Sequence, residues 1–152
     1  MLSAKSVVTF ALVYGLAFTV AGLGGFVPGL NQMHAPQHDP NLHVEGPGHG
    51  SLLGLFHVNV LHNLIHLAFG IWGIVAWRGG FGASRLYARA VAVIYALFVV
   101  MGLVPVLNYV FGLVPIHGHD VWLHLLLAAP AAYFGFAGRR PDPHVVTTTP
   151  AA

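Results

Sequence analysis

Residues 52–77 read LLGLFHVNVLHNLIHLAFGIWGIVAW, an apolar run that contains two asparagines and three histidines but no Lys, Arg, Asp or Glu. About 20 predominantly apolar residues are enough for a helix to cross the hydrocarbon core of a bilayer. A backbone exposed to lipid must satisfy its own hydrogen bonds, and a helix does so within one segment. The stretch therefore predicts a membrane-spanning helix that carries polar side chains in one half.

Three further continuous apolar runs lie at about 7–30, 86–107 and 121–137. The chain of 152 residues is 57% hydrophobic and 7% charged, whereas a soluble domain has about 25% charged residues. We therefore predict an all-α protein, an integral membrane four-helix bundle of up-and-down topology in contact with the lipid bilayer. The bundle should form one domain over residues 1–140, followed by a disordered cytoplasmic tail at 141–152.

The basic residues set the expected orientation, because Lys and Arg accumulate in cytoplasmic loops. All six fall on one side of this topology, and they are Lys5, Arg78, Arg85, Arg89, Arg139 and Arg140. The loops 31–51 and 108–120 contain none. We expect a multi-pass protein of the bacterial cytoplasmic (inner) membrane with cytoplasmic N- and C-termini. The 31–51 loop, rich in His, Pro and Gly, should be periplasmic or external and irregular.

Composition also excludes several functions. The chain has no cysteine, which rules out disulfides, thiolate metal sites and c-type haem attachment. The formal net charge is only +2, and with one basic pair at Arg139-Arg140 we expect no nucleic-acid partner. Neither a nucleotide-binding loop nor a catalytic triad can be placed, so the sequence predicts a protein that is not an enzyme.

Two segments of the sequence resemble each other. Residues 25–31 read GFVPGLN and residues 102–108 read GLVPVLN, each at the outer end of an odd-numbered predicted helix. Each is followed by a His-Gly pair and then by a helix with a similar tetrapeptide, LIHL at 64–67 and WLHL at 122–125. The order fits two parallel helix-pair repeats. The alternative is coincidence, because Gly, Pro and Leu are frequent in this chain.

Polar residues of the 52–77 helix form a stripe at 100° per residue. The stripe consists of Asn59, His62, Asn63 and His66, and continues inward through small residues such as Gly70 and Gly73. In the fourth helix and just before it, Asp120 and His124 share a face with Ala131 and Gly135. We expect the second and fourth helices to meet along these faces, with Asn59 and Asn63 in a polar interhelical seam.

Several chemistries are open to these side chains. His62 and His66, four residues apart, could bind Zn or Cu with His124 or Asp120 as a further ligand. His66 and His124 could instead be the axial ligands of haem b, or a single imidazole could bind a chlorophyll-type pigment. The remaining alternatives are a structural hydrogen-bond network and a small proton or metal-ion transporter.

Short polar motifs on the second and fourth predicted helices also carry a family resemblance. Residues 55–59 (LFHVN), the HNLIH segment at 62–66, Gly70 and the Asp120-to-His124 segment resemble a group of bacterial membrane proteins known as domain of unknown function 4383. The resemblance covers about residues 5–137. It implies four helices and supports the choice of polar residues, but it implies no activity.

Size, the lack of a soluble domain and the lack of a catalytic constellation favour a non-enzymatic accessory or scaffold subunit of a bacterial membrane complex. Such a role implies other membrane-protein subunits as partners. The competing hypotheses are a haem-, metal- or pigment-binding membrane protein that uses His62, His66 and His124, and the small transporter.

Overall fold

The computed structural model describes residues 3–33 and 40–137. Its helices are α1 (Ala4–Gly24), α2 (Val60–Arg78), α3 (Gly80–Leu103) and α4 (His119–Ala132), and α4 continues into a π-helical turn, η1 (Tyr133–Ala137). All four spans, counting α4 with η1 as one, are long and apolar enough to cross a membrane. The predicted multi-pass, mainly helical bundle is therefore confirmed.

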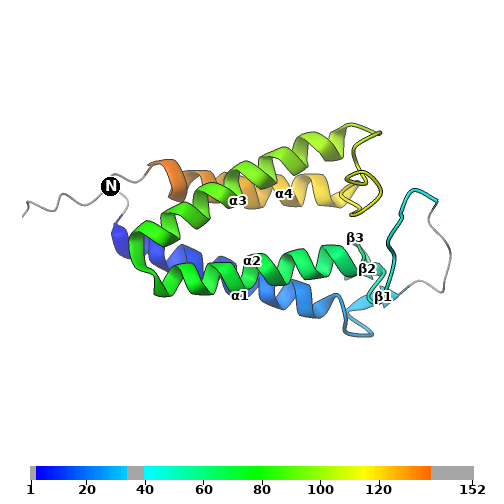
Figure 1. The fold of residues 1–152 in the computed structure, drawn as a ribbon, viewed down its shortest axis with the longest axis horizontal. Coiled ribbons are helices and arrows are strands. Elements are labelled where there is room, and N and C mark those ends of the chain that lie inside the picture. The colour runs from blue at the N-terminus through cyan, green and yellow to red at the C-terminus, as the bar shows by residue number, and fades with distance from the viewer. Residues whose placement is uncertain (1–2, 34–39, 138–152) are drawn as a thin grey trace, which may run out of the picture.

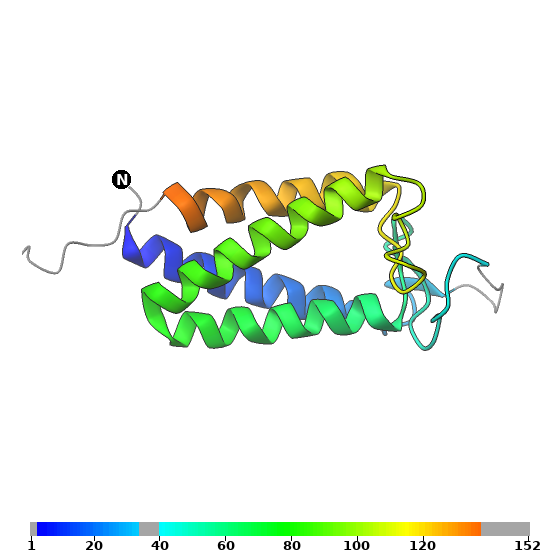
Figure 2. The same ribbon diagram turned by 45° about the horizontal axis from the view of Figure 1, so that its top comes forward.

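The bundle consists of two helical hairpins, α1–α2 and α3–α4, whose members pack closely along their lengths. The start of α1, the turn between α2 and α3 and the end of η1 lie together at one end of the molecule (Figure 1). We call this the basic end, because Lys5, Arg78 and Arg85 belong to it. The opposite end, here the sheet end, holds three short strands and the segment 104–118 (Figure 2).

The second helix begins eight residues later than predicted. Its predicted first turns form strands instead: β2 (Gly50–Leu52) pairs antiparallel with β3 (Phe56–Val58) and with β1 (Asn31–Met33). Leu53 and Gly54 have φ values of 55° and 71°, which the turn between β2 and β3 requires and a helix forbids. The 31–51 loop, expected to be irregular, thus contributes to a sheet. Residues 34–39 and the tail 141–152 lie outside the described part.

The first and third helices also end earlier than predicted, because a Val-Pro pair follows each of them. A proline disfavours helical geometry in the residue before it. The two related segments then form the same turn: Leu30 N–H donates to the Val27 carbonyl at 3.2 Å, and Leu107 N–H donates to the Val104 carbonyl at 2.8 Å. The resemblance between the segments is therefore also structural at this turn. Beyond it they diverge, because Asn31 begins β1 whereas residues 108–113 continue as turns.

Small residues bring α2 against α1. A Cβ added to Gly73 would lie 2.7 Å from the Gly15 Cα, and one added to Gly70 would lie 2.3 Å from the Thr19 hydroxyl oxygen. Likewise Gly135 faces the backbone of α3 at Arg89. The expectation that these small faces join the second helix to the fourth is wrong. Each small face serves the packing of a helix against its own hairpin partner.

Candidate metal centre

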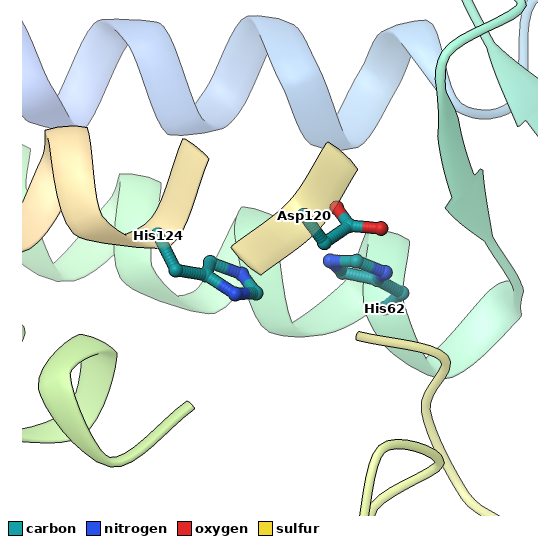
Figure 3. Close-up of side chains that lie close together, drawn as sticks. All are labelled: His62, Asp120 and His124. Atoms are coloured by element: carbon teal, nitrogen blue, oxygen red, sulfur yellow. The ribbon is translucent and has the colours of Figure 1, made fainter. Parts of the chain in front are cut away.

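The two hairpins meet at a buried polar cluster just below the sheet end. His62, in the first turn of α2, faces Asp120 and His124, in the first two turns of α4 (Figure 3). One potential ligand atom from each residue lies within 4.8 Å of those of the other two. Their exposed fractions are 3%, 2% and 2%, so the cluster is shielded from solvent. The structure thus brings His62 of the predicted stripe to Asp120 and His124, although the helix backbones of α2 and α4 are not a closely packed pair.

His66 lies one turn further along α2 and belongs to the edge of the cluster. Its ring is 4.6 Å from that of His62, centroid to centroid, and stacks on Phe18 of α1 at 5.8 Å. It is not part of the three-residue group whose ligand atoms converge. The metal set predicted from the sequence therefore divides into a compact trio of His62, Asp120 and His124 and a neighbouring His66.

The backbone of β3 positions the cluster. The His57 carbonyl lies 3.2 Å from Nδ1 of His62, and because a carbonyl only accepts, Nδ1 must carry the proton. The lone pair of His62 is then on Nε2, the atom available to a metal. The His57 N–H in turn donates to the Asp120 carboxylate. Metal-binding imidazoles in proteins are typically oriented by such a second hydrogen bond.

Sequence reasoning missed this role of His57. The His57 side chain is exposed, and its contribution comes from the peptide group, which every residue except proline has in full. Only the pairing of β3 beside α2 and α4 makes that peptide group available. The histidine spacing contains no signal that could have revealed it.

Three buried atoms of the cluster find no hydrogen-bond partner among the described residues. They are Oδ2 of Asp120, Nδ1 of His124 and Nδ1 of His66. Leaving a buried polar group unpaired costs about 1–3 kcal/mol, and native structures rarely keep several such groups together. The arrangement is therefore incomplete by itself and suits a bound ion, water or polar ligand.

A small cavity separates the histidines of the two hairpins. Its volume is about 40 Å³, and its walls include His62, His66 and His124. Two aromatic rings close it further, since Tyr95 and Phe98 lie 5.1 Å and 5.5 Å from the His124 ring. The space accommodates a metal ion or water, but not a porphyrin. The hypothesis that His66 and His124 are the axial ligands of haem b does not fit this geometry.

The asparagines of the predicted seam bind loops instead of the facing helix. The Asn59 side-chain N–H₂ donates to the carbonyls of Val44 and Leu113 at 2.6 Å and 2.7 Å, while its Oδ1 accepts from His62 N–H and caps α2. Asn63 donates to the Gly48 carbonyl at 3.4 Å. Loop carbonyls cover this end of α2, so the amides meet those acceptors before they could reach α4.

A second, larger cavity reaches the cluster from the side. It has a volume of about 620 Å³ and lies between α1 and α4 beneath the turn that joins β2 to β3. His62, His66 and Asp120 form its polar floor. We call it the lateral cleft.

Four membrane-length helices around a buried His/Asp cluster define a polytopic membrane protein with a candidate intramembrane site. The chain belongs to the family described as Domain of unknown function (DUF4383), which matches residues 9–137. That range includes all four spans almost completely and every residue of the cluster. No curated protein and no solved structure matches the chain.

Proposed function

We propose that this protein binds a divalent transition-metal ion, Zn²⁺ or Cu²⁺, through His62, Asp120 and His124. The observation that carries the proposal is the convergence of three buried potential ligand atoms within 4.8 Å, two of whose side chains have an unpartnered polar atom. Imidazole nitrogens and carboxylate oxygens are ordinary ligands of both metals. Three protein ligands would leave one coordination position open.

The required distances are close to those observed. Zn–N and Zn–O bonds of about 2.0–2.2 Å place the ligands of a tetrahedral site about 3.3 Å from one another. Small side-chain rotations would bring the three residues from the observed spacing to that value. The His57 peptide already holds two of them, His62 and Asp120, in a suitable orientation.

The distribution of charge supports a location in the bacterial cytoplasmic membrane with the basic end inside. Lys5, Arg78 and Arg85 would then face the cytoplasm, as positive residues do. In this orientation both termini are cytoplasmic, and the metal site lies in the periplasmic half of the membrane. The ion would reach it from the sheet end.

The residues between the site and the basic end favour a protein that binds the ion over one that conducts it. The core between the cluster and the basic end is apolar and aromatic, and includes Phe18, Val91 and Tyr95. A conducted ion would need polar groups or water along that route. The predicted transporter therefore has less support than a binding protein.

The proposal is tested by metal content. Protein in lipid nanodiscs, equilibrated with Zn²⁺ and desalted, should retain one ion per chain by elemental analysis. His124→Gln keeps side-chain volume but removes a ligand, so affinity should fall by about a hundredfold or more, beyond the usual loss for an outer-shell group. His119→Gln, at the exposed first residue of the same helix, is the matched control. Equal binding by the native protein and His124→Gln would refute the site.

The accessory-subunit role stays a prediction, and it is compatible with a resident metal. Mild extraction from native membranes, followed by mass spectrometry of co-purifying proteins, would test it. Fixed stoichiometry with one or more membrane proteins is expected. A monodisperse bundle without partners would argue against this role, but it would leave the metal proposal intact.

A further inference from the structure

The lateral cleft has the construction of a ligand site. Small side chains of α1, including Ala17, Ala21 and Gly24, form one wall, and Leu52 and Phe56 cover the end beneath the sheet. Its volume of about 620 Å³ falls within the range of about 300–1,000 Å³ typical of small-molecule sites. Such sites are mostly apolar with a few convergent polar groups, as here.

We propose that the lateral cleft binds a neutral, membrane-soluble molecule whose head is an oxygen-bearing ring, of the quinone or quinol class. The head would rest on Asp120 and His66, and the apolar tail would follow α1 into the bilayer. The cleft shares His62 and Asp120 with the proposed metal site, but His66 is outside the compact trio and His124 does not line the cleft, so the two sites can be disrupted separately.

The polar floor indicates the chemistry of the head. Asp120 Oδ2 and His66 Nδ1 have no partner among the described residues, and their side chains are 2% and 8% exposed. A ring carbonyl can accept from an imidazole N–H, and a ring hydroxyl can donate to a carboxylate. A hydrocarbon chain would leave both groups unpaired, at a cost for each.

Charge argues against a phospholipid headgroup. Among the described residues that line the cleft, none is Lys or Arg, and the only ionisable carboxyl is that of Asp120. A phosphate would approach that carboxyl without any cation to compensate. A neutral head meets no such penalty.

The walls indicate the route into the site. Leu16 and Val20 line the cleft and are 50% and 69% exposed, on the face of α1 that meets lipid. A lipophilic molecule can thus enter sideways from the bilayer without crossing water. This route differs from that of a metal ion, which would come from the sheet end.

The probe is decylubiquinone, titrated into nanodiscs with and without the protein. We expect saturable uptake of one molecule per chain above partitioning into empty discs, with quenching of Trp122, whose ring lies 5.9 Å from that of the cleft residue Phe56. Ala21→Phe should fill the cleft and weaken binding at least tenfold. Leu23→Phe, on an exposed position of the same helix that does not line the cleft, should leave binding unchanged.

The metal and quinone proposals are distinguished by testing each variant for both ligands. Ala21→Phe should lose the quinone and keep the zinc, whereas His124→Gln should lose the zinc and keep the quinone. If Ala21→Phe does not fold, Ala17→Phe, one turn away on the same wall, replaces it. Uptake equal to that of empty discs, or equal binding by the cleft-filling variant and Leu23→Phe, would overturn the quinone proposal.

Discussion

Within the α1–α2 hairpin the two backbones almost touch, and a Cβ on Gly15 would lie 2.8 Å from the backbone nitrogen of Ile74. Between the two hairpins, at the sheet end, side chains hold the helices apart and leave two cavities. The first contact offers little space for a ligand and stabilises the fold. The contact between the two hairpins at the sheet end leaves space, and it contains every residue of the candidate site. At the sheet end of this protein, packing is tight within the α1–α2 hairpin and loose and polar between the two hairpins.

The largest expected effect comes from breaking the tight contact. Gly15→Ala would place a methyl group within about 3 Å of α2 backbone atoms that cannot move aside. Such overpacking costs about 1–3 kcal/mol, and we expect the upper end of this range. Unfolding in mixed micelles with increasing SDS, followed by circular dichroism, would measure it.

The control for this variant is Gly82→Ala in α3, where an added Cβ meets no atom within 4 Å. Alanine is a better helix former by up to about 1 kcal/mol, so this change should be neutral or stabilising. Equal effects of the two substitutions would mean that close α1–α2 packing contributes little to stability.

A smaller effect is expected from Asn59, which ties loops of both hairpins together through Val44 and Leu113. Asn59→Ala removes a helix cap worth about 1 kcal/mol and takes the donor away from two partly buried carbonyls. We expect a loss of about 2 kcal/mol in the same assay. Ser3→Ala removes the exposed cap of α1 and should cost less; a larger cost for Ser3→Ala would contradict the role of Asn59 in joining the hairpins.

The smallest expected effect comes from removing a single hydrogen bond between the two hairpins. The Tyr14 hydroxyl donates to the Leu127 carbonyl at 3.1 Å and links α1 to α4 across the hairpins. Tyr14→Phe should cost about 1 kcal/mol, the usual net value of such a bond. Tyr133→Phe, at an exposed position, should cost nothing measurable. A cost for Tyr14→Phe above that of Gly15→Ala would reverse the relative importance of the two interfaces.

Hydropathy predicted the spans, and helical periodicity placed His62 and His66 on one face and Asp120 and His124 on another, because both patterns depend on local composition. Periodicity did not predict that His62 is closer than His66 to Asp120 and His124. It did not predict β2 and β3, since Leu-Leu-Gly-Leu-Phe at 52–56 is as apolar as a membrane helix. Asn59 is the residue that marks the true start of α2. An asparagine before an apolar run is a typical helix cap, but its spacing also fits the helical stripe, which favoured the wrong boundary.

The partner of each small face could not be read from the sequence either. Periodicity places Gly70 and Gly73 on one face, but it does not say which helix that face contacts. The complementary surface is on α1, where Gly15 lets the α2 backbone approach closely. A pattern on one helix thus becomes an interface only when the opposing helix is also considered.

The spans of this bundle differ in length. With a rise of about 1.5 Å per residue, the 19 residues of α2 and of the fourth span cover about 28 Å, whereas the 24 residues of α3 cover about 36 Å. Hydrocarbon cores of about 30 Å match the short spans, whereas α3, which runs diagonally in Figure 2, is longer than that. A thicker bilayer would exceed the short spans and draw Asp120, the second residue of α4, deeper into hydrocarbon. The thickness of the surrounding bilayer would therefore change the environment of the cluster without any direct contact with its residues.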